Sequence, residues 1–173
     1  MKNNPYTKIL SIVFMSLFSF TISAEENKNV SEHQYNFYTG NFDFSDHKQK
    51  AILFGFQHQN EKLERNTFLG NASPITGGFI TENSAAYVYT GVEWNYAMSD
   101  KVKFTPSFAP GLYHEGNGKD LGHVLEFKTE VQLSYSFSKD TSFGASYNHV
   151  SNASLGDKNP GANSYMFNFL KKF

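Results

Sequence analysis

The stretch that decides the fold is HVLEFKTEVQLSYSF, residues 123–137. Its odd-numbered positions are mostly apolar, whereas its even-numbered positions include Glu126, Lys128 and Glu130. Alternation with a period of two is typical of a β-strand whose two faces meet different surroundings. The stretch is also much longer than an ordinary strand of about 5–6 residues. The pattern therefore predicts one long strand with an apolar face and a charged face.

Seven other segments carry a similar alternation, which is weakest in 34–43 and 66–81. The expected strands are 34–43, 48–58, 66–81, 85–96, 102–113, 122–137, 141–151 and 163–173. Clusters of turn-forming residues separate several of these strands. No helical period extends beyond about two turns. The chain is therefore predicted to be all-β, with eight antiparallel strands.

Two architectures fit eight such strands: a soluble lipid-binding barrel of the periplasm and a membrane barrel. Three features favour the membrane barrel. The strands are long enough for a tilted crossing of about 9–11 residues, the charged face suits a polar barrel interior, and the chain ends on Phe173 after alternating aromatic residues. We predict an eight-stranded antiparallel transmembrane β-barrel of the bacterial outer membrane.

The N-terminus has the layout of a secretory signal peptide. Lys2 and Lys8 precede an apolar stretch that ends in Ser23-Ala24, as expected for a cleavable signal. A membrane anchor is the alternative interpretation. The expected organisation is a signal peptide over 1–24, a flexible lead-in over 25–33 and the barrel over 34–173.

Composition excludes several classes of function. The formal net charge of the 173 residues is −1, so no basic surplus indicates a nucleic-acid partner. The chain has no cysteine, which excludes disulfides, zinc–thiolate sites and a cysteine nucleophile. The histidines outside strand 141–151 show no ligand spacing, so we predict neither a metal nor another cofactor. These histidines are His33, His47, His58, His114 and His123.

Two polar side chains interrupt the apolar face of the strand 141–151. His149 and Ser151 follow Phe143, Ala145 and Tyr147 on the odd-numbered face, which should meet lipid. An unpaired polar group in hydrocarbon costs several kcal/mol, so a barrel needs a reason to place them there. Because both ends of an even-stranded barrel lie in the periplasm, the loop 152–162 is extracellular. His149 and Ser151 are therefore expected in the outer leaflet.

A symmetric hairpin would place Ser151 opposite Asn163 and His149 opposite Tyr165. His149 and Asn163 would then be diagonal neighbours within side-chain reach. A hydroxyl, an imidazole and a group that orients the imidazole would share one face. That is the arrangement of a serine hydrolase, in which the imidazole accepts the hydroxyl proton.

Three stretches resemble a known family. Residues 149–155 read HVSNASL, residues 159–165 read NPGANSY, and residues 122–128 read GHVLEFK. Together with the terminal Phe173 they are similar to the outer-membrane lipid A 3-O-deacylases of the PagL type. The resemblance covers roughly the last 60 residues. It implies an outer-membrane barrel that hydrolyses the ester at position 3 of lipid A, with lipopolysaccharide and membrane lipid as partners.

The resemblance also implies roles for single residues. Ser151 matches the nucleophile and His149 the general base, while Asn159 and Asn152 match asparagines near the active site. We expect Asn159 to donate to the oxyanion. The family pattern has glutamate where this chain has Asn163, which we expect to orient His149 without supplying a charge.

Three alternatives stay open. Asp157 could take the orienting role in place of Asn163. A catalytically weak or inactive structural or adhesive barrel is the alternative function, and the chain could form a homodimer.

Overall fold

Residues 33–46 and 49–173 are described by the computed structural model. They form eight long strands in a closed antiparallel barrel, as predicted. The long strands are β1 (His33–Phe42), β2 (Ala51–Asn60), β4 (Gly70–Thr81), β5 (Ala86–Trp94), β7 (Val102–His114), β8 (Leu125–Ser136), β9 (Thr141–Ser151) and β10 (Ala162–Lys172). The predicted signal peptide over 1–24 and nearly all of the lead-in lie outside the described residues, and the barrel already begins at His33.

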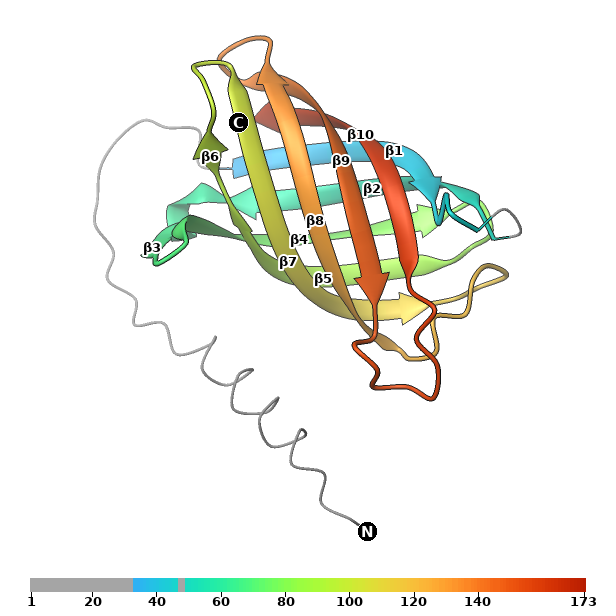
Figure 1. The fold of residues 1–173 in the computed structure, drawn as a ribbon. Helices are drawn as coiled ribbons and strands as arrows, with labels where there is room; N and C mark the ends of the chain where they lie inside the picture. The colour runs from blue at the N-terminus through green and yellow to red at the C-terminus, as the bar shows by residue number, and fades with distance from the viewer. Residues whose placement is uncertain (1–32, 47–48) are drawn as a thin grey trace. The chain divides into compact units, whose positions relative to one another are not determined.

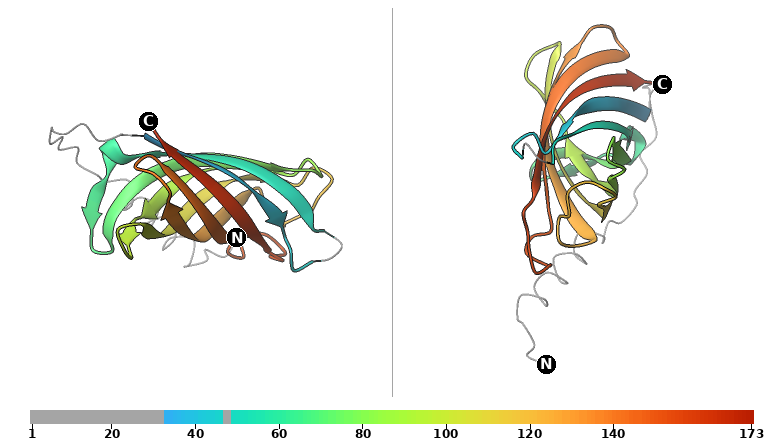
Figure 2. Two further views of the ribbon diagram at one scale, coloured as in Figure 1. Left: turned by 90° about the horizontal axis from the view of Figure 1, so that it is seen from above. Right: turned by 90° about the vertical axis from the view of Figure 1, so that its right-hand side faces the viewer.

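Each long strand pairs with its neighbours in the chain, and the barrel closes between its first and last strands. The order is β2-β1-β10-β9-β8-β7-β5-β4, and β2 pairs again with β4. Figures 1 and 2 show the tilted strands curving around one interior. The connection 152–161 between β9 and β10 extends from one end of the barrel, opposite the end that carries β3 and β6 (Figure 1).

Two expected strands are divided in the structure, and the bounds of the others differ from the expected ones by at most three residues. The expected strand 66–81 contains a tight turn, so that β3 (Arg65–Thr67) folds back on the start of β4. Gly70 follows this turn with φ +102°, a conformation that side chains other than glycine rarely adopt. The expected strand 85–96 ends at Trp94, and its continuation is the two-residue strand β6 (Tyr96–Ala97). A 3-10 turn, η1 (Glu61–Leu63), joins β2 to β3.

The two faces of the barrel reverse the arrangement of a soluble protein. Large apolar side chains point outward, including Phe54 at 61% and Phe167 at 76% exposure. Polar side chains such as Gln57, Lys128 and Asn148 are buried inside. An apolar exterior around a polar interior is the signature of a transmembrane barrel. The soluble lipid-binding barrel is therefore the wrong alternative.

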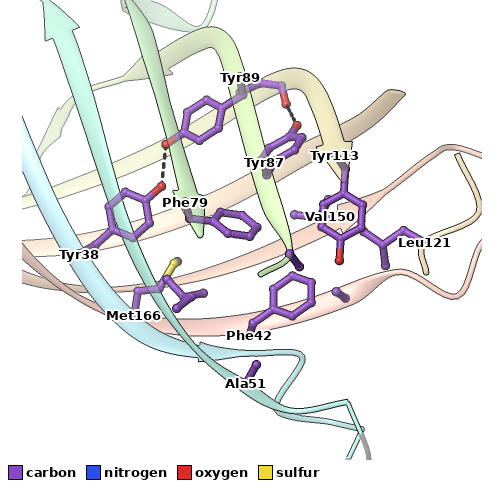
Figure 3. Close-up of a cluster of buried hydrophobic side chains, with 14 of the residues drawn as sticks. Tyr38, Phe42, Ala51, Phe79, Tyr87, Tyr89, Tyr113, Leu121, Val150 and Met166 are labelled. Atoms are coloured by element: carbon purple, nitrogen blue, oxygen red, sulfur yellow. Dashed lines mark hydrogen bonds between the residues drawn. The ribbon is translucent and has the colours of Figure 1, made fainter. Parts of the chain in front are cut away.

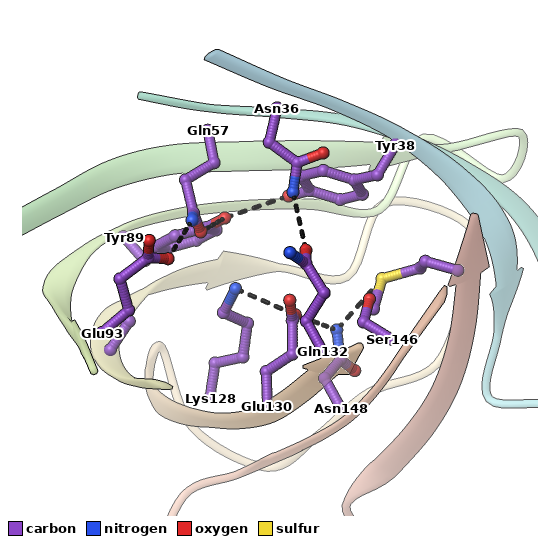
Figure 4. Close-up of polar contacts among 12 residues, drawn as sticks. Asn36, Tyr38, Gln57, Tyr89, Glu93, Lys128, Glu130, Gln132, Ser146 and Asn148 are labelled. Atoms are coloured by element: carbon purple, nitrogen blue, oxygen red, sulfur yellow. Dashed lines mark hydrogen bonds and ion pairs between the residues drawn. The ribbon is translucent and has the colours of Figure 1, made fainter. Parts of the chain in front are cut away.

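Polar contacts fill the middle of the barrel (Figure 4). The Lys128 ammonium lies 3.1 Å from a Glu130 carboxylate oxygen and 4.0 Å from the centre of the Tyr89 ring. The Tyr89 hydroxyl donates to Gln57 at 2.9 Å, and the Gln57 amide donates to Glu93 at 2.9 Å. Because buried polar groups are costly unless they are paired, this network stabilises one alignment of the strands around it.

An apolar cluster lies inside the barrel on the side of the connection 152–161. It includes Phe42, Phe79, Tyr87, Tyr113, Leu121 and Val150 (Figure 3). Val150 is fully buried between His149 and Ser151 in the sequence. Since side chains alternate along a strand, its inward position directs His149 and Ser151 to the outer surface. The core thus fixes the face on which the candidate site lies.

Among the described residues, none of the helical turns is long and apolar enough to cross a membrane.

Candidate active site

The centre of the candidate site is the contact between His149 on β9 and Asn163 on β10. The two residues are direct partners in the strand ladder. His149 Nδ1 lies 2.8 Å from Asn163 Oδ1. Sequence reasoning placed these two residues together, and the structure brings them into hydrogen-bond contact.

The predicted register of this hairpin is wrong by two residues. Tyr165 pairs with Tyr147 rather than with His149, and Asn163 pairs with His149 rather than with Ser151. A shift of two residues leaves every side chain on its own face, so the alternation alone cannot distinguish the two registers. The asymmetric connection 152–161 sets the register. As a result Asn163 is a direct rather than a diagonal neighbour of His149.

Asn163 defines which ring nitrogen of His149 carries the proton. Its Oδ1 atom accepts a second hydrogen bond from the Tyr147 hydroxyl at 2.7 Å. An amide oxygen only accepts, so His149 Nδ1 must be the donor to it. The other ring nitrogen, Nε2, then carries a lone pair and can accept a proton. Tyr147 was not singled out in the sequence, although it lies on the same alternating face two residues before His149.

Ser151 lies on the same outward face as His149, two residues further along β9. It is half-buried and pairs with Phe127 of β8. Two residues advance a strand by about 7 Å, and among the described residues no hydrogen bond joins the His149 and Ser151 side chains. The hydroxyl, the imidazole and the orienting amide therefore occupy one outer surface of β9 and β10.

Asn159 and Asn152 make different contacts beside Ser151. Asn159 Oδ1 accepts from the Asn152 backbone N–H at 3.1 Å. This bond places the Asn159 amide next to the peptide group that follows Ser151, with its NH₂ group available as a donor. The Asn152 side chain is buried and donates to the carbonyls of Leu121 and Lys158, at 2.7 and 2.9 Å. Asn152 thus holds two loops together, whereas Asn159 is exposed.

The connection 152–161 packs closely on the loop between β7 and β8. A Cβ at Gly122 would lie 2.3 Å from the Lys158 carbonyl oxygen, and one at Gly156 would lie 2.3 Å from the Gly122 carbonyl oxygen. The Lys158 ammonium also pairs with Asp120 at 2.6 Å. This hydrogen bond, helped by the Gly122 N–H, lowers the pKa of Asp120. The link between the loops is therefore retained down to a pH below the ordinary pKa of an aspartate, about 3.9.

Gly161 supports the imidazole from the loop side, and no sequence pattern predicted this role. Its φ is +60°, and a Cβ there would lie 2.7 Å from His149 Cε1 and 3.2 Å from Nε2. A side chain at this position would have to displace the ring. The backbone of Gly161 therefore forms one wall of the site.

We expect Gly161→Ala to lower by about tenfold any turnover in which His149 acts as a base, because even small misplacement of a catalytic group is costly. The measurement is turnover of purified protein on lipid A in detergent micelles, the substrate that the sequence resemblance implies. Gly118→Ala, in the neighbouring loop, is the control: its Cβ would meet no atom closer than 3.2 Å. Equal losses in both variants would contradict a role for Gly161 at the imidazole.

Among the described residues, no three histidine, aspartate or glutamate side chains are grouped closely enough to hold a metal ion. Asp157, the alternative orienting group, is exposed in the connection 152–161. Among the described residues, the side-chain hydrogen bond of His149 is to Asn163.

Most of this chain matches one family of known proteins. Residues 38–172 match the family model described as Lipid A 3-O-deacylase (PagL). No curated protein sequence gives a significant match. The crystal structure of the outer membrane enzyme PagL aligns with a TM-score of 0.63 and 17% identity, covering 81% of this chain and 99% of that chain.

Barrels of other kinds have a similar shape. De novo designed transmembrane β-barrels align with a TM-score of 0.58 and 8% identity, covering 86% of this chain and 100% of theirs. Neisserial surface protein A aligns with a TM-score of 0.58 and 11% identity, covering 82% of this chain and 96% of that chain. At these identities the likenesses show a shared fold, and a fold alone does not define an activity.

Proposed function

The chain belongs to the lipid A 3-O-deacylase (PagL) family, and we propose that it hydrolyses the ester bond holding the acyl chain at position 3 of lipid A. The observation that carries the proposal is the 2.8 Å contact between His149 Nδ1 and Asn163 Oδ1, with Ser151 on the same outward face. A lipid ester in the outer leaflet would meet this face directly. The barrel is an outer-membrane protein by family and fold, and export by a signal peptide ending at Ala24 belongs to the proposal.

The proposed reaction has two steps. His149 Nε2 takes the proton from the Ser151 hydroxyl as its oxygen attacks the ester carbonyl carbon. The bond to the sugar oxygen then breaks, and His149 returns the proton to that oxygen, which leaves an acyl-serine. In the second step His149 takes a proton from water, whose oxygen attacks the acyl carbonyl. The fatty acid is released and Ser151 regains its proton.

Asn159 has the proposed role of oxyanion donor. Its NH₂ group can face the carbonyl oxygen of an ester attacked by Ser151, because its own oxygen is held by the Asn152 N–H. A hydrogen bond that strengthens as charge develops lowers the barrier. Every proposed group comes from one barrel, so the site needs no second copy of the chain even if a homodimer forms.

The test of the function is the mass of lipid A from cells that produce this protein. Loss of one acyl chain, mapped to position 3 by fragmentation, is expected relative to cells carrying the empty vector. Production and insertion are checked by heat-modifiable mobility of the barrel on gels. Unchanged lipid A in cells that contain the inserted barrel would contradict the proposed activity.

A structural or adhesive barrel without useful catalysis is the second candidate. The observation that favours a structural barrel is the asparagine at position 163, since a neutral amide stabilises the imidazolium less than a carboxylate does. The same experiment separates the two candidates, because a structural barrel would leave lipid A intact.

Asn163→Ala is expected to slow turnover by about tenfold. Without the amide oxygen, His149 loses a hydrogen bond that fixes both its ring position and its tautomer, an effect on the order of 1 kcal/mol. Asp157→Ala is expected to retain wild-type turnover, because Asp157 is exposed in the loop. Steady-state rates on purified lipid A give the ranking. The opposite ranking would assign the orienting role to Asp157.

A further inference from the structure

The turn after β1 carries three residues that continue the contacts of Asn163. Asn163 Nδ2 donates to Ser45 Oγ at 3.5 Å, and Ser45 Oγ donates to Asp43 Oδ1 at 3.3 Å. The Asn163 backbone N–H also points to Asp43 Oδ1, at 3.4 Å. The Phe44 N–H donates to the Asn163 carbonyl at 3.0 Å, so the turn is attached to β10 on both sides of this residue.

The chemistry of these groups gives the chain of contacts a direction. A carboxylate only accepts hydrogen bonds, so the single Ser45 hydroxyl proton goes to Asp43. The Ser45 oxygen is then an acceptor, and it favours the NH₂ group of Asn163. This orientation turns Asn163 Oδ1 toward His149 Nδ1, which must carry the proton. The lone pair is thereby left on Nε2, where Ser151 needs it.

Asp43 is a buried carboxylate with a charged partner and an uncommon backbone conformation. Its side chain is 1% exposed, and the ammonium of Lys119 lies 2.5 Å from Oδ2. Lys119 comes from the loop between β7 and β8 and also lies 3.9 Å from Asp46. Asp43 has a φ of +48°, a left-handed conformation that is uncommon for residues other than glycine. A buried ion pair in a strained turn is costly, and strain of this kind is concentrated at functional sites.

We propose that Asp43, acting through Ser45 and Asn163, sets the orientation and tautomer of His149. This inference rests on the proposed function and deepens it. Asp43 and Ser45 are positioning residues, and the unit that acts is Ser151, His149, Asn163, Ser45 and Asp43 rather than three residues. Asp43 acts on His149 through the Ser45 hydroxyl and the Asn163 amide, and because its own charge is paired with Lys119 its role is to orient the amide.

The first experiment compares Ser45→Ala and Asp43→Asn with the exposed control Asp157→Asn. Ser45→Ala breaks the chain of contacts but leaves the Asp43–Lys119 ion pair intact, so it is informative even if Asp43→Asn fails to fold. We expect kcat on lipid A micelles to fall by about tenfold in both variants, with KM nearly unchanged, since the affected group is not a lipid-binding group. Wild-type kcat in Ser45→Ala would overturn the proposal.

The second readout does not depend on activity. Nitrogen-15 NMR of histidine-labelled protein in micelles reports the tautomer of His149, with the signal assigned by its loss in His149→Gln. Wild-type protein is expected to show the proton on Nδ1, and Ser45→Ala is expected to show a mixture of tautomers. An unchanged tautomer in that variant would overturn the proposal. If wild-type protein leaves lipid A intact but the tautomer still depends on Ser45, the proposed function is wrong. The hydrogen bonds from Asp43 through Ser45 to Asn163 are then still supported as the groups that orient His149.

The third experiment is a rescue that a merely structural role would not give. Asn163→Glu places a carboxylate directly beside His149. In that background, Ser45→Ala is expected to cost less than about twofold in kcat, because the carboxylate no longer needs the hydroxyl to orient it. A tenfold cost in both backgrounds would mean that Ser45 only supports the fold of the turn, and the proposal would be wrong.

Discussion

Ser151→Ala is expected to abolish release of the acyl chain at position 3 of lipid A. The variant removes the oxygen that would form the acyl-enzyme, while Val150 keeps β9 in place from the inside of the barrel. Loss of a serine nucleophile lowers kcat by roughly 10⁴-fold or more in related chemistry. In cells, the lipid A mass should therefore equal that of cells carrying the empty vector.

The matched control is Ser154→Ala, which removes a hydroxyl from the exposed start of the same connection. Ser154 lies three residues after Ser151 and has a φ of +63°, which alanine adopts about as readily as serine. Its lipid A should show the full loss of one acyl chain. The strains that produce wild-type protein, Ser151→Ala and Ser154→Ala should contain equal amounts of heat-modifiable barrel. Differences in expression then cannot explain differences in lipid A. Deacylation by Ser151→Ala protein would end the assignment of Ser151 as nucleophile.

The alternation of side chains predicted most of the fold. Strands such as β8 and β9 have one apolar and one polar face, and this pattern alone indicates both the strand and its orientation in a membrane barrel. The turn before Gly70 was missed because the alternation in 66–81 is weak and does not mark where the strand begins. The register of β9 and β10 was wrong because a two-residue shift preserves the pattern.

One part of the candidate site could be predicted from the sequence, and the other part could not. His149, Ser151 and Asn163 could be found from the sequence, since polar groups on a lipid-facing surface stand out against their neighbours. Asp43 and Ser45 could not, because they lie more than 100 residues before His149 in the sequence and belong to a polar turn of ordinary appearance. Only closure of the barrel, through the pairing of β1 with β10, brings that turn to the imidazole. The support from Gly161 also depends on a loop conformation that has no sequence period.

Asn159→Ala is expected to lower kcat by about 10²–10³-fold, the usual loss for one oxyanion donor. This substitution removes two contacts at once, however. The Asn159 side chain also accepts from the Asn152 N–H at 3.1 Å, so a loosened loop could produce part of the loss.

Asn159→Asp separates the two effects. Aspartate keeps an oxygen for the Asn152 N–H and is close to asparagine in size, but it replaces the donor NH₂ with a negatively charged oxygen. If Asn159 stabilises the oxyanion, the aspartate variant should be at least as slow as the alanine variant, because it adds repulsion where negative charge develops. If Asn159 only anchors the loop, the aspartate variant should recover most of the wild-type rate. Single-turnover rates of acyl release from lipid A micelles distinguish these outcomes, because they measure the chemical step without product release.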